Sequence, residues 1–116
     1  QAQFFANLYA RIRKYGSIPT GITQNVETLL SRQEGRNLLY NSEFIVLLKQ
    51  KKTTIPYLLQ TINLTDALIR YIEKPKALGT GLIIAGTTTV PFENPIPENT
   101  ELFRLVATDA YRKLEE

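Results

Sequence analysis

Arg13, Thr23 and Gln24 have side chains suited to contact with a phosphate. An arginine at a helix end can stabilise the charge that develops in phosphoryl transfer, especially across a subunit boundary. A glutamine amide both donates and accepts hydrogen bonds, so it can orient a water molecule or sense a phosphate. If residues 17–23 form a strand, Thr23 and Gln24 lie at its carboxyl end, where open α/β sheets bind their ligands.

The same residues have a purely structural interpretation, which their spacing alone favours. Gln24 would then only join the cap of the following helix. Arg13 and Lys14 would complement the dipole at the end of the first helix. Polar residues are common where a strand turns into a helix, whatever their function.

Other catalytic arrangements are missing from the sequence. The chain has no histidine and no cysteine, which removes most catalytic metal sites, zinc fingers and the Ser-His and Cys-His nucleophiles, so we expect no metal site. Gly79 and Gly81 form a Gly-x-Gly pair, but an apolar strand follows without Lys-Thr, so this is no Walker A loop. On turn chemistry alone the pair predicts a turn. No apolar run ends in Asp-Glu, so a Walker B acid is also missing.

The densest basic cluster consists of Lys49, Lys51 and Lys52. It could contact nucleic-acid phosphates. Three lysines without interleaved aromatic residues are nevertheless more typical of a solvated loop. The formal net charge of +3 is equally compatible with an ordinary surface.

Helices and short strands alternate along the chain, which predicts an α/β layer structure. The expected helices cover residues 1–15, start after Asn25, start again at a capping box over residues 31–34, cover residues 53–60 and contain residues 64–72. The expected strands are residues 17–23, an apolar run over 44–48 buried on both faces, and a hairpin of 82–85 with 89–92. Prolines place that hairpin at a sheet edge. Residues 102–107 fit a helix, but their place after an edge hairpin favours a strand, followed by a helical tail from Asp109.

The whole chain, residues 1–116, is expected to be a single domain. Its 43% hydrophobic and 22% charged residues are ordinary for a globular protein of this size. No apolar run approaches the ~18 residues that span a bilayer. The first helix has no capping residue before it, so we expect that sequence preceding Gln1 is missing.

Four blocks of the chain, in the same order, resemble the C-terminal part of the conjugative type IV secretion ATPases, the family that includes the TraC and TraE transfer proteins. They are residues 13–30, residues 41–50, residues 79–86 with 90–92, and residues 101–108, and they are spread along nearly the whole sequence. Arg-Lys-Tyr-Gly followed by Pro-Thr-Gly-Ile-Thr-Gln is most similar to transfer proteins of Gram-positive plasmids and conjugative transposons.

The resemblance implies part of a RecA-like fold, a three-layer sheet with helices plus an antiparallel edge hairpin. It implies a cytoplasmic ATPase, peripheral at the inner face of the cell membrane, that forms hexamers, contacts other secretion-channel proteins and uses ATP with Mg²⁺ to drive conjugative DNA transfer. Thr23 and Gln24 match the family's Thr-Gln motif near the γ-phosphate, and Arg13 is the candidate trans-acting arginine. Gly79 and Gly81 match a glycine-containing block near the nucleotide base.

The chain departs from the family by lacking the Walker loop and the Walker B acid, which make most of the triphosphate and Mg²⁺ contacts. We therefore expect both motifs upstream, and a chain that by itself neither binds ATP tightly nor hydrolyses it. Loss of the neighbouring parallel strands would expose a sheet edge, which predicts self-association. The motor interpretation also requires Thr23 and Gln24 at the carboxyl edge of a central parallel sheet, facing a cavity.

Two other functions stay open on the sequence. One is a non-catalytic module that docks onto other channel proteins. The other is a DNA-contacting domain that uses the lysines of residues 49–52.

Overall fold

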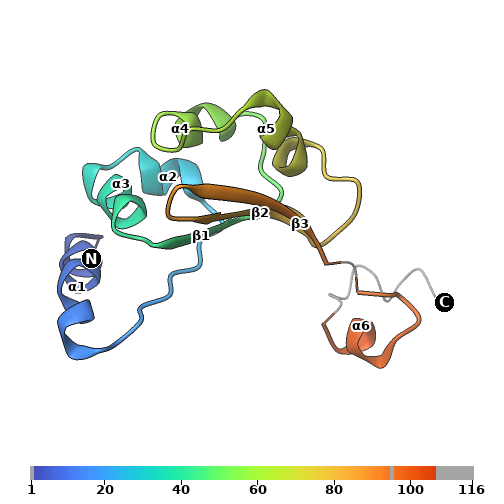
Figure 1. The fold of residues 1–116 in the computed structure, drawn as a ribbon, viewed down its shortest axis with the longest axis horizontal. Coiled ribbons are helices and arrows are strands. Elements are labelled where there is room, and N and C mark those ends of the chain that lie inside the picture. Colours follow the sequence, from blue (N-terminus) through green and yellow to red (C-terminus); the bar gives the residue numbers. More distant parts are fainter. Residues whose placement is uncertain (1, 95, 107–116) are drawn as a thin grey trace.

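A computed structural model describes residues 2–94 and 96–106 as a mixture of helices and strands (Figure 1). The helices are α1 (Ala2–Arg11), the 3-10 helix η1 (Ile12–Tyr15), α2 (Val26–Leu30), α3 (Gln33–Tyr40), α4 (Ile55–Leu59), α5 (Asp66–Glu73) and α6 (Glu101–Val106). The strands are β1 (Phe44–Leu47), β2 (Thr80–Ala85) and β3 (Thr88–Glu93). The predicted α/β class is thus confirmed at the level of mixed helix and strand.

The three strands form one antiparallel sheet in the order β1-β2-β3. Leu47 lies opposite Leu82, and Ile83 lies between Val46 on one side and Val90 on the other. The Gly86 N–H donates to the Glu43 carbonyl at 3.2 Å, just beyond the β1–β2 ladder. Hydrogen-bonded pairs alternate along an antiparallel ladder. Every second residue of β1 therefore turns its N–H and C=O away from β2.

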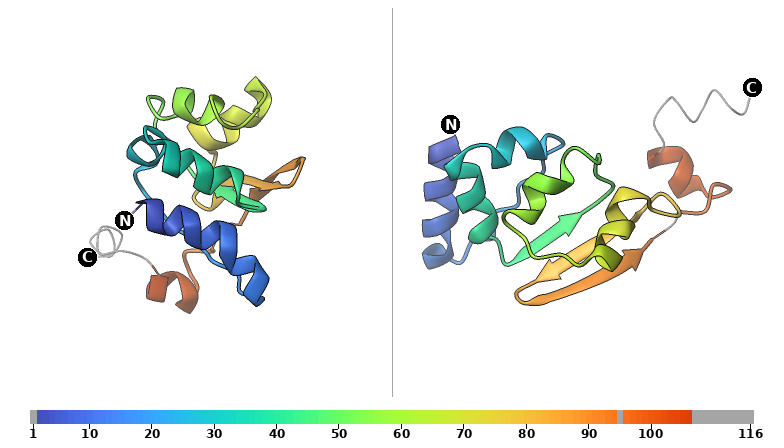
Figure 2. Two further views of the ribbon diagram at one scale, coloured as in Figure 1. Left: turned by 90° about the vertical axis from the view of Figure 1, so that its left-hand side faces the viewer. Right: turned by 90° about the horizontal axis from the view of Figure 1, so that it is seen from above.

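One face of the sheet carries the core. Leu47, Leu82 and Ile84 pack there into a single cluster with Leu58 and Ile72 of the covering helices. Figures 1 and 2 show α2 to α5 gathered on that side, whereas α1 and α6 lie at opposite ends of the molecule. Burial of this apolar surface holds the helices to the sheet.

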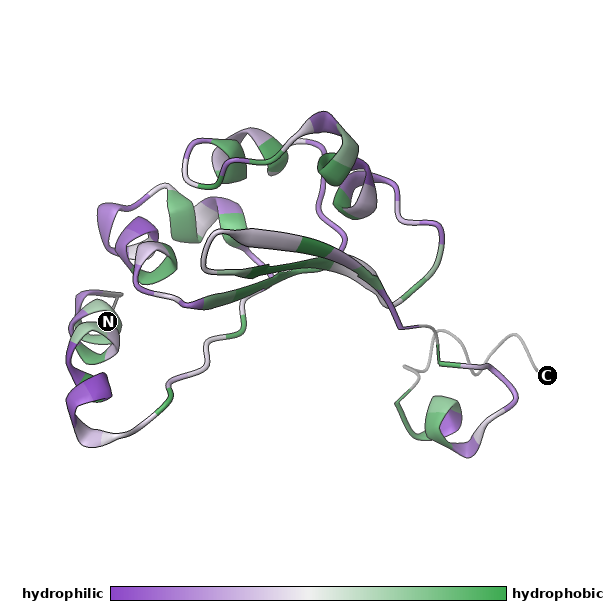
Figure 3. Cartoon of the chain, in the orientation of Figure 1, coloured by the Kyte–Doolittle hydropathy of each residue, from purple (hydrophilic) through white to green (hydrophobic). Residues whose placement is uncertain are grey.

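The opposite face, which we call the outer face, has no cover among residues 2–94 and 96–106. Phe44 is 71% exposed there, Val46 58% and Val90 51%. Figure 3 shows hydrophobic colour along β1. The prediction of a strand buried on both faces was therefore wrong, because an antiparallel sheet can leave one face open. The described part of the chain has two layers rather than the three expected from the resemblance.

Several sequence signals fix the helix ends. The Asn25 side chain accepts a hydrogen bond from the Thr28 N–H at 3.1 Å, which confirms the expected cap of α2. Thr65 caps α5 in the same way, and Gly16 ends η1 with a left-handed φ of 68°. The predicted capping box over residues 31–34 was wrong. Ser31 instead donates to the Thr28 carbonyl at 2.9 Å, which closes the end of α2.

Two strand predictions were also wrong. Residues 17–23 are not a strand, and Ile18 and Ile22 are 91% and 94% exposed. Pro19 and Gly21 weaken strand pairing in that stretch. Residues 101–106 form helix α6, where the Thr100 hydroxyl accepts from the Phe103 N–H at 3.3 Å. The helical tail expected from Asp109 lies outside the described residues.

Candidate functional site

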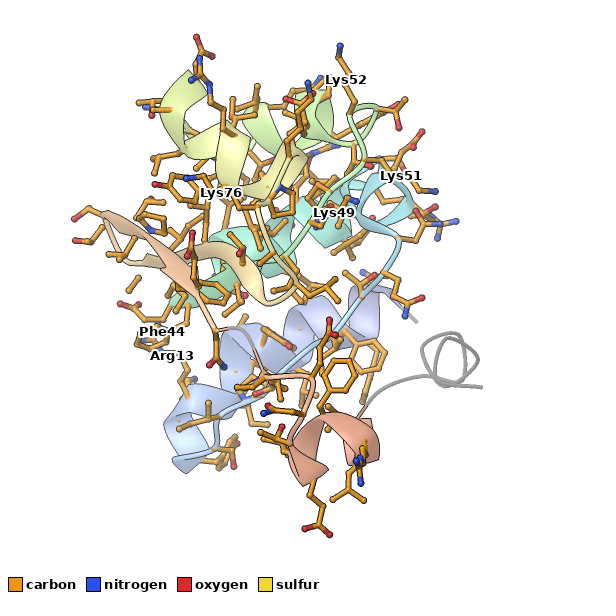
Figure 4. All side chains as sticks on the ribbon, turned by 90° about the vertical axis from the view of Figure 1, so that its right-hand side faces the viewer. Arg13, Phe44, Lys49, Lys51, Lys52 and Lys76 are labelled. Atoms are coloured by element: carbon orange, nitrogen blue, oxygen red, sulfur yellow. The ribbon has the colours of Figure 1, made fainter. Side chains whose placement is uncertain are left out.

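Arg13 lies in η1, on the exposed end of the first helical segment. Its carbonyl accepts from the Gly16 N–H at 3.2 Å, so the backbone of Arg13 closes the helix. In Figure 4 the Arg13 side chain lies below the sheet, and Lys52 lies above it. The guanidinium is accessible, as a residue that acts on another subunit would have to be.

Thr23 and Asn25 together cap α2. The Thr23 hydroxyl accepts from the Asn25 N–H at 3.2 Å, and Asn25 in turn caps the helix. Gln24 lies exposed in the bend between them. The Thr23 hydroxyl therefore organises the turn before α2, whereas the structural interpretation had assigned a part in this cap to Gln24. The side chain of Gln24 has no hydrogen-bond partner among the described residues.

A shallow hollow of about 330 Å³ lies beside this turn. It is lined by Thr23, Asn25, Thr28, Leu29, Arg32 and Gly35. Arg32 is exposed, whereas the neighbouring Arg36 already donates to the Leu30 carbonyl at 2.7 Å. The sequence analysis missed Arg32 as a residue of this region. The sequence feature that could have indicated Arg32 is a basic residue in the break between α2 and α3.

The arrangement required by the motor interpretation is not present in residues 2–94 and 96–106. No two strands there are parallel, and Gln24 follows an irregular segment rather than a strand. Gln24 also does not line the 330 Å³ hollow, although its neighbours do. The predicted position of Thr23 and Gln24 at the carboxyl edge of a central sheet was therefore wrong for the described chain.

Gly79 and Gly81 serve the sheet. Gly79 has a φ of 81°, a left-handed conformation that favours glycine, and it leads the chain into β2, as the predicted turn requires. A Cβ on Gly81 would collide with the Leu47 carbonyl and would meet the Phe92 ring at 3.0 Å. Gly81 therefore lets β1 and Phe92 approach the middle strand closely. Neither glycine lines the hollow near Thr23.

Five exposed lysines lie in the loop after β1 and in the residues that follow α5. The Gln50 N–H donates to the Ile72 carbonyl at 2.7 Å, which holds the loop after β1 against the end of α5. We call this set the lysine patch; it consists of Lys49, Lys51, Lys52, Lys74 and Lys76, and Figure 4 labels all of them except Lys74. None of these ammonium groups forms an ion pair within the described part of the chain. The hydrogen bond between Gln50 and Ile72 brings the cluster found in the sequence close to the end of α5, which Lys74 and Lys76 follow in the chain.

Residues 2–94 and 96–106 contain neither a cluster of metal ligands nor a membrane-spanning helix. Among them, no group of three or more acidic side chains could hold a metal ion. None of the described helices has the length and apolar character needed to cross a membrane.

Comparison with known proteins gave no match to any protein-family model, any curated protein or any solved structure.

Proposed function

We propose that the chain is the C-terminal portion of a cytoplasmic ATPase that energises conjugative DNA transfer through a type IV secretion channel. The four ordered sequence blocks carry this proposal. The first block begins within η1 and ends at the last residue of α2, the second contains β1, the third contains β2 and part of β3, and the fourth contains α6.

In this proposal the chain contributes residues to a nucleotide site that other sequence completes, and that other sequence must also supply the parallel strands that residues 2–94 and 96–106 do not contain. Gln24 would orient the attacking water or sense the γ-phosphate, and Arg13 would stabilise transition-state charge on a neighbouring subunit of a hexamer. Both side chains are exposed, so a nucleotide held elsewhere can reach them. Thr23 would position Gln24, since its hydroxyl fixes the turn. Gly79 and Gly81 would place their backbone near the base of the nucleotide.

The test uses the longer ATPase that contains this chain. Gln24→Ala and Arg13→Ala should each abolish ATP hydrolysis while sparing hexamer assembly. The matched controls are Gln60→Ala and Arg70→Ala, which remove exposed side chains of the same types and should leave hydrolysis near the starting rate. Near-normal hydrolysis in both the Gln24 and Arg13 variants would refute the proposal. The 116-residue chain alone should show no turnover, because it has no phosphate loop.

A second candidate is a non-catalytic module that binds other proteins of the secretion channel. The open outer face favours it, because Phe44, Val46 and Val90 are all more than half exposed on one side of the sheet. In that case the Gln24 and Arg13 variants are neutral for hydrolysis. Loss of channel binding would then follow from Phe44→Ser instead.

A further inference from the structure

The free edge of β1 offers unpaired backbone groups to another strand. Phe44 and Val46 turn their N–H and C=O away from β2, and no backbone partner for these groups occurs within the described residues. Residues 44–48 contain no charge and no proline, the usual devices that keep a sheet edge from pairing. This edge is therefore open to strand addition.

We propose that β1 pairs antiparallel with β1 of a second copy of this chain, about a twofold axis at Val46. The outward N–H and C=O of Val46 then bond those of the second copy's Val46. Phe44 pairs in the same way with Leu48. The Leu48 carbonyl already accepts from its own Gln50 side chain at 3.1 Å, but a carbonyl oxygen has a second lone pair. Two three-stranded sheets become one continuous sheet.

Charge complementarity selects this register. β1 itself ends at Leu47, and the proposed pairing extends it through Leu48 and Lys49. With Val46 on the axis, Glu43 of each copy then lies opposite Lys49 of the other, at both ends of the paired strands. Both side chains are exposed and free to meet. Opposite charges directly across two strands are stabilising, and like charges are destabilising.

The neighbouring symmetric registers are worse. An axis at Ile45 places Glu43 opposite Leu47, so the charge has no partner. An axis at Leu47 needs the backbone of Gln50 opposite Phe44. The Gln50 N–H is already held by the Ile72 carbonyl at 2.7 Å, so the chain has left the strand direction there.

Side-chain alternation also agrees with the pairing. Phe44 and Leu48, 71% and 54% exposed, meet on the outer face and extend its apolar surface across the two copies. Ile45 and Leu47 meet on the core side. A twofold contact uses the same edge on both copies, so the assembly closes as a dimer. It does not depend on a nucleotide, so its failure would leave the proposed ATPase function untouched.

Charge reversal tests the register itself. Glu43→Lys alone and Lys49→Glu alone each create two like-charge contacts in a homodimer, and each should raise the dimer dissociation constant about tenfold or more. An equal mixture of the two variants restores both opposite-charge contacts and should dimerise like the unchanged chain. The double variant E43K/K49E should also recover. Analytical ultracentrifugation over a concentration series measures all four samples.

Two matched variants distinguish association through the β1 edge from association through the outer face. Val46→Lys places a charge at the edge, and Val90→Lys places one on the same outer face, where the side chain is similarly exposed, at 51% against 58%. Only Val46→Lys should prevent dimer formation, and far-ultraviolet circular dichroism checks that both remain folded. A monomer at every concentration, single variants that dimerise normally, a mixture that fails to recover, or an equal loss in Val90→Lys would each overturn the proposal.

Discussion

The two edges of the sheet differ in one decisive residue. The Asn94 N–H donates to the Gly79 carbonyl at 3.0 Å, so the alternation of the ladder turns Thr89, Pro91 and Glu93 of β3 outward. Pro91 thus occupies the middle outward position of β3, as Val46 does in β1. Proline has no N–H to donate, so it blocks further pairing at the β3 edge.

The contrast shows how one small sheet can be open on one side and closed on the other. Val46 offers both a donor and an acceptor, whereas Pro91 offers an acceptor only. With a single open edge, strand addition ends after two copies. With two open edges, the same sheet could add copies without limit, as aggregating strands do.

The largest effect is expected from closing the open edge. Val46→Pro removes the donor from each copy at the twofold axis, and neither donor serves a bond within the chain. The loss of two hydrogen bonds should raise the dimer dissociation constant about a hundredfold. Sedimentation should show a monomer throughout the accessible concentration range. The fold should persist, since proline is tolerated on edge strands; a retained dimer would show that the contact lies elsewhere.

The asymmetry between the edges was only partly readable from the sequence. Two strand-like segments, residues 82–85 and 89–92, around the Gly86-Thr87 turn predicted the hairpin correctly, and its prolines placed it at a sheet edge. The apolar run beginning at Phe44 predicted a strand but not which face is covered, because burial depends on helices far away in the chain. Capping by Asn25 and Thr65 was predictable because it acts within one turn.

The candidate site was less predictable than the fold. Thr23 and Gln24 were assigned to a strand end because the preceding residues include two isoleucines. Nothing pairs with that stretch in the described chain, and strand formation needs a partner that local sequence does not supply. Lys74 joined the lysine patch only because the loop at Gln50 bonds to the end of α5, a contact with no local signature.

The next largest effect is expected on stability, from a substitution in β2, the middle strand of the sheet. Gly81→Ala pushes a methyl group into the Leu47 carbonyl and the Phe92 ring, so β1 and β3 must both move. Overpacking of this kind should lower the free energy of unfolding by about 2 kcal/mol. Thermal unfolding measures it. Gly16→Ala is the control: its strained φ of 68° should lower stability by about 1 kcal/mol, with nothing within 4 Å to collide with. Equal stability of the Gly81 variant and the unchanged chain would contradict this packing account.

A smaller effect should follow from opening the closed edge. Pro91→Val restores an outward N–H at the middle of β3, so both edges could then accept strands. Species larger than a dimer should appear. The association constant for contact through the β3 edge should be about tenfold higher in the Pro91 variant than in the unchanged chain. Light scattering measures their mass, and Thr89→Val, which adds no donor, is the control. If the Pro91 variant stays dimeric, some other feature of β3 closes that edge.

The smallest effect belongs to the lysine patch, which also separates DNA contact from dimer formation. Lys49 belongs both to the lysine patch and to the proposed contact between two β1 strands. Lys51 and Lys52 belong to the lysine patch only, because they lie beyond the paired strands. Changing Lys51 and Lys52 to Gln should leave the dimer dissociation constant unchanged. It should reduce the salt slope of single-stranded DNA binding by about 0.7 for each lysine that contacts a phosphate. Fluorescence anisotropy over a salt series gives that slope. A slope that does not change would mean that the ammonium groups of Lys51 and Lys52 contact solvent and not DNA phosphates.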